Sequence, residues 1–199
     1  MQSPTSQYQN ASSSAAVEPA TATRRALFFD RDGVVNRRIV DGYVRNAEEF
    51  EMLPDVLTVL PDVHRAGWRA VLVTNQRGIA LGVMTEHDLH ALHAWLQQTL
   101  FERCGHTFDA IEYCPHHRDA GCDCRKPAPG MLLRAAHAHG IDLANSWMVG
   151  DSASDIEAAH RAGCRAVLIA PADTPSEAEL VVPSLAEGWA GIRQAERLR

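Results

Sequence analysis

The chain has 199 residues, a hydrophobic fraction of 46% and a formal net charge of −6 at pH 7. This length predicts one globular domain with a sizeable core, and the negative charge argues against a broad nucleic-acid surface. No apolar run approaches the roughly 20 residues of a membrane span, so we expect no membrane partner. Residues 1–24 lack the apolar centre of a secretory signal; they predict a disordered tail before a domain over 25–199, and a cytoplasmic location.

Apolar and amphipathic segments alternate along the rest of the chain. Apolar runs predict strands over residues 26–30, 69–74, 108–113, 147–150 and 165–170, with a further short strand over 180–182. Helical spacing and glycine or proline punctuation predict helices over about 54–66, 85–103, 129–140, 154–163 and 185–197. This alternation is typical of an α/β fold, a Rossmann-like doubly wound parallel sheet with helices on both faces. Residues 33–50 are expected to form a loop or small flap.

Polar side chains follow the ends of several predicted strands. They are Asp30 and Asp32 before Gly33; Thr74, Asn75 and Gln76; Arg125 and Lys126 in the loop after the third strand; and Asp151 and Asp155. Ligands of open α/β sheets bind at the carboxyl ends of the strands, so these groups predict one pocket. Asp30 and Asp151 suit Mg²⁺, which prefers oxygen ligands. Thr74, Asn75 and Lys126 would supply donors and positive charge for phosphate oxygens.

Three of the five cysteines lie close together in the loop after the third strand. Cys114, His116, Cys122 and Cys124 fit a closed tetrahedral Zn²⁺ site, which predicts a small structural zinc-binding loop over residues 114–124. His117 is an alternative ligand, and the alternative to a metal site is a surface loop in which Cys and His happen to crowd. The odd number of cysteines argues against a disulfide framework. The remaining two, Cys104 and Cys164, are expected to be small buried hydrophobic residues.

Four motifs in this order resemble those of the haloacid dehalogenase (HAD) superfamily of phosphatases. They are Asp30-Arg-Asp-Gly, Thr74 at a strand end, Lys126 before Pro127, and Gly150-Asp-x-x-x-Asp155. The resemblance implies that Asp30 attacks phosphorus, that Asp32 acts as general acid and then base, and that Thr74 and Lys126 steady the phosphoryl group. It implies Mg²⁺ held by Asp30, the Asp32 carbonyl and Asp151, with Asp155 orienting Lys126 or a metal-bound water. The spacing leaves no room for a cap domain.

A finer resemblance connects the chain with the D-glycero-D-manno-heptose 1,7-bisphosphate 7-phosphatase family. It rests on Thr74-Asn-Gln-Arg-Gly-Ile-Ala, Asp41-Gly-Tyr-Val, Cys114-Pro-His-His and Cys122-Asp-Cys-Arg-Lys-Pro. It implies a phosphorylated sugar substrate and removal of its 7-phosphate in nucleotide-activated heptose biosynthesis. Candidate substrate-binding residues are Asp41, Tyr43, Asn75, Gln76, Arg77, Arg125 and Ser152.

The chain departs from that family pattern at two places. Ser152 stands where members often carry a lysine, and Arg77, Arg37 or Arg38 could compensate for the missing charge. The segment between His117 and Cys122 is short, which puts its contact with substrate in doubt.

Three other functions stay open. One is a histidinol-phosphate phosphatase, whose domain shares the cysteine loop. A polynucleotide 3′-phosphatase would need a basic track, which a net charge of −6 does not offer. A non-catalytic zinc-stabilised binding module would be expected to lack a catalytic acid, yet Asp30 and Asp32 are both present. Because no long apolar stripe is evident, we expect a monomer.

Overall fold

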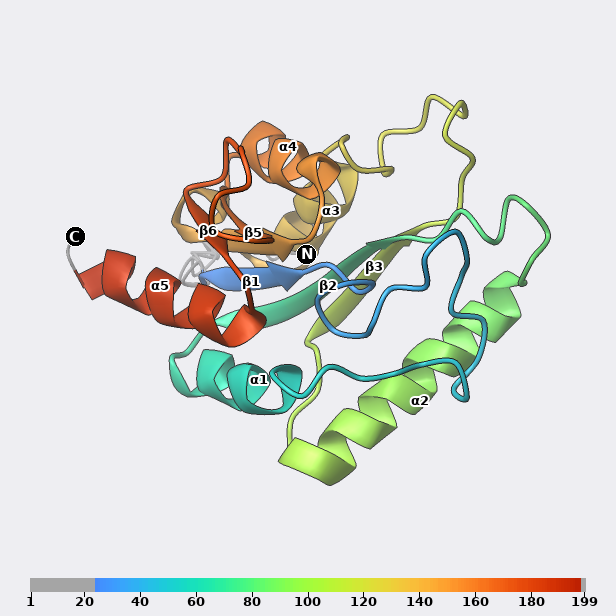
Figure 1. Cartoon of the computed structure of the whole chain (residues 1–199), viewed down its shortest axis with the longest axis horizontal. Coiled ribbons are helices and arrows are strands. Elements are labelled where there is room, and N and C mark those ends of the chain that lie inside the picture. The colour runs from blue at the N-terminus through green and yellow to red at the C-terminus, as the bar shows by residue number, and fades with distance from the viewer. Residues whose placement is uncertain (1–23, 198–199) are drawn as a thin grey trace, which may run out of the picture.

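A single parallel sheet lies at the centre of the molecule (Figure 1). The computed structural model describes residues 24–197, and within them the strands are β1 (Ala26–Phe29), β2 (Arg69–Asn75), β3 (Ala110–Cys114), β4 (Trp147–Gly150), β5 (Arg165–Ile169) and β6 (Leu180–Val182). Their order is β3-β2-β1-β4-β5-β6, and each neighbouring pair is parallel. The order changes direction between β1 and β4, which is where ligands of such sheets bind.

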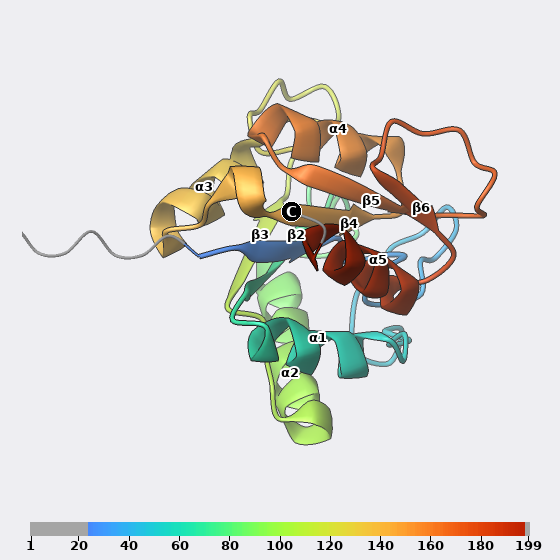
Figure 2. The ribbon, with the colours of Figure 1, turned by 90° about the vertical axis from the view of Figure 1, so that its left-hand side faces the viewer.

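Helices cover both faces of the sheet (Figures 1 and 2). One face carries α1 (Val56–Arg65), α2 (Glu86–Cys104) and α5 (Leu185–Arg197), and the other carries α3 (Gly130–His139) and α4 (Ala153–Ala162). A short 3-10 helix, Leu143–Asn145, precedes β4. The doubly wound α/β fold expected from the sequence is therefore confirmed, and no cap domain interrupts the part of the chain that the structure describes.

Strand β1 lies in the middle of the sheet and is covered on both faces, which explains why its sequence is apolar at every position. Leu27 and Phe29 pack into the core under α1, α2 and α5, whereas Phe28 packs into the core under α3 and α4. All three side chains are fully buried. Successive side chains of a strand point to opposite faces, so a strand buried on both faces needs a continuous apolar run.

The structure shifts several predicted element boundaries by one or two residues. One of the two-residue differences is at β3, which begins at Ala110 instead of residue 108. The backbone of Phe108 is bonded to a side chain instead of a strand, because its N–H donates to Gln97 Oε1 and its carbonyl accepts from Gln97 Nε2, both at 2.9 Å. Strand propensity alone does not reveal this pairing with α2.

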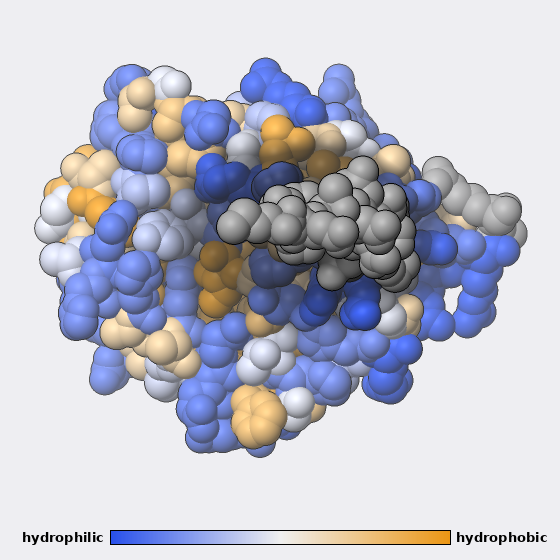
Figure 3. Space-filling view, turned by 180° about the vertical axis from the view of Figure 1, so that it is seen from behind, coloured by the Kyte–Doolittle hydropathy of each residue, from blue (hydrophilic) through white to orange (hydrophobic). Residues whose placement is uncertain are grey.

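Three further expectations concern the N-terminal tail, membrane-spanning helices and the surface. The expected tail over 1–24 lies outside the described residues except for Arg24, which forms a bridge with Ile141; the division into a tail and one domain stays a prediction. None of the helices within residues 24–197 is long and apolar enough to cross a bilayer. Seen from behind, the visible surface is mostly hydrophilic, with apolar residues in small separate groups (Figure 3).

The carboxylate of Glu196 attaches α5 to the sheet. Its Oε1 accepts hydrogen bonds from Trp147 Nε1 at 3.1 Å and Arg165 Nη2 at 2.5 Å, and its Oε2 accepts from Arg25 Nη1 at 2.6 Å. Burial raises the pKa of Glu196, but the bonds from Trp147 and Arg165 and the arginine charges outweigh it, so the pKa lies below its usual value.

We expect Glu196→Gln to lower the free energy of unfolding by about 1–3 kcal/mol at pH 7, because it removes a charged acceptor shared by three donors. A lowered folded-state pKa means that this stabilisation is full above the unfolded-state pKa of about 4.3 and is lost as the pH falls through the folded value. Urea unfolding of both proteins should therefore give curves that differ at pH 7 and converge as the pH falls through the lowered folded-state pKa of Glu196. A constant difference would contradict this account, and Glu187→Gln, exposed on the same helix, is the control.

Candidate active site

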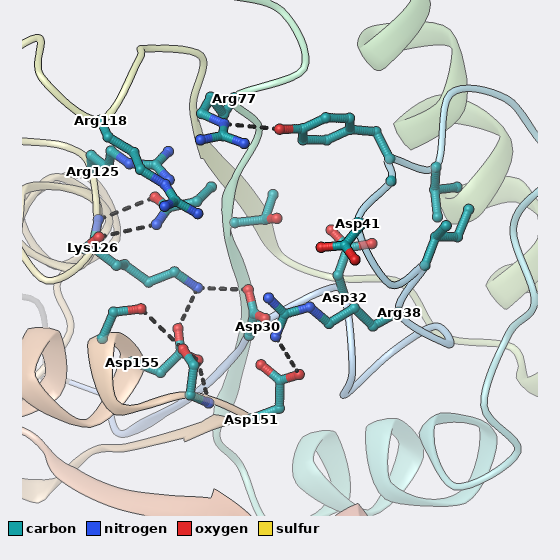
Figure 4. Close-up of a pocket in the computed structure, with 18 of the residues that line it drawn as sticks. Asp30, Asp32, Arg38, Asp41, Arg77, Arg118, Arg125, Lys126, Asp151 and Asp155 are labelled. Carbon is teal, nitrogen blue, oxygen red and sulfur yellow. Dashed lines mark hydrogen bonds and ion pairs between the residues drawn. The ribbon is translucent and has the colours of Figure 1, made fainter. Parts of the chain in front are cut away.

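A cleft of about 560 Å³ opens at the carboxyl ends of β1, β2 and β4 (Figure 4). Apart from Gln76, it collects every residue expected to take part in catalysis, magnesium binding or substrate binding: Asp30, Asp32, Asp41, Tyr43, Thr74, Asn75, Arg77, Arg125, Lys126, Asp151, Ser152 and Asp155. The flap contributes Arg38, Ile39 and Gly42 to the lining, and the cysteine-rich loop contributes Arg118. The strand ends thus bring together side chains that are far apart in the sequence.

A buried ammonium group occupies the floor of the cleft. The side chain of Lys126 is 2% exposed, and its Nζ lies 2.6 Å from Asp30 Oδ1 and 2.7 Å from Asp155 Oδ1. The same Nζ donates to the carbonyl of Val73 at 2.9 Å, so each of its three donors has a partner. Burial lowers the pKa of Lys126, but the charges of Asp155 and Asp30 outweigh it and raise the pKa above its usual value. Lys126 is therefore protonated.

The groups around Asp30 shift the pKa of its carboxyl group in opposite directions. Burial is the largest influence and raises the pKa of Asp30, Lys126 lowers it, and Asp155 and Asp32 raise it; together they place this pKa at about 7. A protonated lysine at 2.6 Å favours the ionised form of its partner. We therefore take the pair as ionic, with the pKa of Asp30 above its usual value.

The oxygens of Asp30, Asp151 and Asp155 lie within 4.8 Å of one another. Asp155 is already engaged, because its Oδ1 faces Lys126 and its Oδ2 accepts from the backbone N–H and the hydroxyl of Ser152 at 3.1 and 2.6 Å. Burial, followed by the charge of Asp155, raises the pKa of Asp151, and the Arg38 guanidinium at 3.3 Å only partly opposes this. Crowded carboxylates of this kind fit a hard cation such as Mg²⁺, with Asp30 and Asp151 as its side-chain ligands.

Two glycines allow these carboxylates to approach one another. Gly33 has a φ of +104°, in the left-handed region, and a Cβ at this position would lie 2.1 Å from Asp151 Oδ2. A Cβ on Gly150 would lie 2.2 Å from the Cβ of Asp155. The turn expected at Gly33 is thus also a point of close contact, which only a residue without a side chain permits.

Three donors hold the carboxylate of Asp32. Arg31 Nη2 lies 3.1 and 3.0 Å from its two oxygens, Asn36 Nδ2 donates to Oδ1 at 2.9 Å and Gln76 Nε2 to Oδ2 at 3.1 Å. Burial raises the pKa of Asp32, but the charge of Arg31 and these hydrogen bonds outweigh it, so the pKa lies below its usual value. The Asp32 side chain is therefore fixed on the cleft wall in its ionised form.

The contacts of Asp32 involve one residue that was expected to bind substrate and two further residues. Gln76, expected to bind substrate, is buried behind the cleft and also donates to Thr74 Oγ1 at 2.8 Å. Its amide is used to orient Asp32 and Thr74. Arg31 and Asn36 were not among the expected site residues. A charged residue directly after a buried apolar strand was the available signal for Arg31; the sequence carries no comparable signal for Asn36.

The remaining polar groups connect the strands to the loops around the cleft. Asn75 exchanges two hydrogen bonds of 3.1 Å with the backbone of Lys126. Arg77 Nε donates to the hydroxyl of Tyr43 at 2.8 Å, which joins the flap to the loop after β2. Arg125 Nη1 donates to the carbonyl of His116 at 3.4 Å. These bonds fix the entry to the cleft.

The four expected zinc ligands meet beside the cleft. The ligand atoms of Cys114, His116, Cys122 and Cys124 lie within 4.8 Å of one another. Cys114 Sγ is 3.7 Å from Cys122 Sγ and 3.5 Å from His116 Nδ1. Zn–S bonds of about 2.3 Å in a tetrahedron require sulfur atoms about 3.8 Å apart, so the cluster could bind zinc. His117, the alternative ligand, instead pairs with Asp119.

Fold and site together define the class of this protein as a HAD-like hydrolase, and a HAD-hydrolase-like family model matches residues 123–187. The chain is 42% identical over 147 residues to D-glycero-β-D-manno-heptose-1,7-bisphosphate 7-phosphatase from Pseudomonas aeruginosa, a match that covers 74% of this chain and 82% of the relative. The corresponding enzyme from Photorhabdus laumondii is 39% identical over 175 residues, covering 81% and 92%.

Solved structures agree with these relatives. The crystal structure of D,D-heptose 1,7-bisphosphate phosphatase from B. bronchiseptica, complexed with magnesium and phosphate, superposes with a TM-score of 0.76 at 37% identity. The match covers 86% of this chain and 99% of that one. The chain therefore belongs to the D-glycero-D-manno-heptose 1,7-bisphosphate 7-phosphatase family of HAD-like phosphatases.

We expect the purified protein to contain about one zinc ion per chain, because four soft or borderline donors enclose a tetrahedral position. Cys122→Ala should lose the metal and lower the unfolding temperature, since zinc binding is coupled to folding of its loop. Elemental analysis and thermal unfolding measure the two effects. Cys104→Ala, which removes a cysteine outside the cluster, is the control and should keep the metal. Metal-free native protein would refute the assignment.

Proposed function

We propose that this chain is a Mg²⁺-dependent phosphatase that removes the 7-phosphate of D-glycero-β-D-manno-heptose 1,7-bisphosphate. The observation that carries the proposal is the ionic group of Asp30, Lys126 and Asp155 beside Asp151 at the sheet's switch point. The names of relatives about 40% identical over most of the chain support the substrate. We further propose that it acts as a monomer in the cytoplasm, in nucleotide-activated heptose biosynthesis.

In the proposed first step, Asp30 attacks the phosphorus atom and the bond to the sugar oxygen breaks. Lys126 contacts Oδ1 of Asp30, so the other carboxylate oxygen is available for attack. Thr74 orients the phosphoryl oxygens, and the positive charge of Lys126, whose three donors are already engaged, attracts them. Mg²⁺ bound by Asp30, Asp151 and the Asp32 carbonyl would supply charge neutralisation, which is the main requirement of phosphoryl transfer. Asp155 keeps Lys126 in place and charged.

Asp32 acts as the general acid in the first step and as the general base in the second. In the substrate-free site Asp32 is ionised; the negative charge of a bound phosphate disfavours that form, and Asp32 takes up a proton as the substrate binds. It donates this proton to the sugar oxygen as that oxygen leaves, while Asp30 becomes an aspartyl phosphate. In the second step Asp32 takes a proton from a water molecule that attacks the same phosphorus atom. The bond between phosphorus and Asp30 then breaks, phosphate is released and the free carboxylate is restored. Two easier displacements thereby replace one direct attack by water.

A bisphosphate brings a second anion, and the cleft offers arginines for it. Arg77, Arg118 and Arg125 all line the cleft, and guanidinium groups can hold phosphate oxygens in a bidentate manner. We propose that they bind the phosphate that is not transferred, and that Asp41 and Tyr43 bind sugar hydroxyls. These arginines also offer the positive charge that Ser152 lacks. A histidinol phosphate carries one phosphate, so it would use this surface less well.

We expect the protein to hydrolyse β-heptose 1,7-bisphosphate with a kcat/KM on the order of 100-fold or more above that for histidinol phosphate, because only the bisphosphate engages the arginines. A phosphate-release panel with both heptose anomers, fructose 1,6-bisphosphate, histidinol phosphate and a 3′-phosphorylated oligonucleotide measures this directly. Equal or reversed rates for histidinol phosphate would reject the heptose assignment, and turnover confined to the oligonucleotide would require a different function.

Asp30→Asn should reduce kcat by about 10⁴-fold or more, because an amide does not replace the attacking carboxylate. The fold should persist, since Lys126 keeps its ion pair with Asp155. Circular dichroism, thermal unfolding and zinc content should stay at wild-type values. The control is Asp173→Asn, an exposed acid outside the cleft lining, which should leave kcat unchanged. Substantial residual turnover of Asp30→Asn would remove Asp30 from its proposed role.

A further inference from the structure

A buried arginine lies directly behind the carboxylate of Asp32. Arg31 is 1% exposed and does not line the cleft. Its Nη2 contacts both oxygens of Asp32, at 3.1 and 3.0 Å, and its Cζ lies 6.0 Å from the ring centre of Phe50. Its Nε and Nη1 have no hydrogen-bond partner among residues 24–197. A full positive charge is therefore buried with Asp32 as its anionic partner.

This arrangement is a poor way to stabilise the fold. Removing a guanidinium from water is costly, and leaving two of its donor nitrogens without partners adds to that cost. An apolar side chain of similar volume would pack against Phe50 without this desolvation penalty, and such replacements of buried ion pairs are often neutral or stabilising. The role of the buried Arg31 charge therefore lies in its contact with Asp32 and not in the stability of the fold.

The residues around Arg31 favour its contact with Asp32. His93, buried on α2, is neutral: burial, followed by the charges of Arg31 and His90, lowers its pKa to about 3. A neutral imidazole neither repels the guanidinium nor competes with Asp32 as an anion. Asn36 is also buried and holds Asp32 from another side, because its Nδ2 donates to Asp32 Oδ1 and to the carbonyl of Arg37, both at 2.9 Å.

We infer that Arg31 is a positioning residue for the reaction: its contact with both carboxylate oxygens fixes Asp32 in the orientation from which Asp32 passes a proton to the leaving sugar oxygen. This inference rests on the proposed function, because the role of Asp32 is part of it. Arg31 touches neither substrate nor phosphorus and acts through Asp32. A proton donor that is already held in one orientation at the leaving oxygen does not have to be ordered during the reaction.

The test compares two leaving groups in Arg31→Met. A sugar oxygen leaves with difficulty unless it is protonated, whereas p-nitrophenolate leaves as an anion, and kcat/KM reports only the steps up to the first irreversible departure. For Arg31→Met we expect kcat/KM to fall about 10–100-fold with heptose 1,7-bisphosphate, and by less than about threefold with p-nitrophenyl phosphate. Equal losses with both substrates, or no loss with either, would overturn the inference.

Arg165→Met is the matched control. Arg165 is also largely buried: it pairs with Glu196 at 2.5 Å, lies 4.2 Å from the ring centre of Trp147 and has an Nε without a partner in the described chain. It does not line the cleft. Its replacement should lower the unfolding temperature without changing the ratio of the two kcat/KM values. A shift of that ratio as large as that of Arg31→Met would show that lost stability alone causes the effect.

Arg31→Lys keeps the charge and should recover part of the lost kcat/KM with the sugar substrate. The same two-substrate comparison is made with this variant if Arg31→Met does not fold, and an unchanged ratio there overturns the inference. If the wild-type protein hydrolyses other alkyl phosphates but not heptose 1,7-bisphosphate, the proposed substrate fails and the comparison uses the alkyl phosphate that is hydrolysed. A wild-type protein that hydrolyses no alkyl phosphate overturns both proposals.

Discussion

The active site depends on one buried ammonium group shared by two carboxylates and a backbone carbonyl. Lys126 lies between Asp30 and Asp155, and its third bond goes to the carbonyl of Val73 in β2. These partners come from β1, from β2 and from the first turn of α4, so the ion group forms only when those elements pack correctly. The charge of a buried lysine is tolerated because each of its donors has a partner. Catalytic geometry and folding are thus coupled at Lys126.

Around this centre, the cleft is lined by two kinds of segment. The strand ends hold the carboxylates, and rigid parallel strands fix their relative positions. The loops hold other groups of the lining, for which we propose contacts with the rest of the substrate: Arg118 and Arg125 come from the cysteine-rich segment, and Tyr43 comes from the flap. The bond between Arg77 and Tyr43 joins two of these loops across the cleft. Changes in such loops can alter substrate preference while leaving phosphoryl transfer intact.

The sequence predicted the parts of this arrangement that follow from local pattern. A continuous apolar run ending in Asp30 indicates a doubly buried strand, and the switch-point rule then places its acids beside Asp151. It did not predict Arg31 or Asn36 as partners of Asp32, or that Gln76 lies behind the cleft, because those contacts depend on how the flap and β2 pack against the end of β1. Tertiary partners, not spacing, decide which polar groups face substrate.

The proposed mechanism requires a covalent phosphoryl group on Asp30. Rapid acid quenching of the enzyme during turnover of heptose 1,7-bisphosphate labelled in the 7-phosphate, followed by peptide mapping, tests this requirement. We expect a labelled, base-labile phosphoryl group on the peptide that contains Asp30, formed and lost at rates compatible with turnover. Label on another residue would contradict this mechanism. So would release of p-nitrophenolate from labelled p-nitrophenyl phosphate by Asp32→Asn with no labelled enzyme at any quench time, because that leaving group needs no proton while dephosphorylation is slowed.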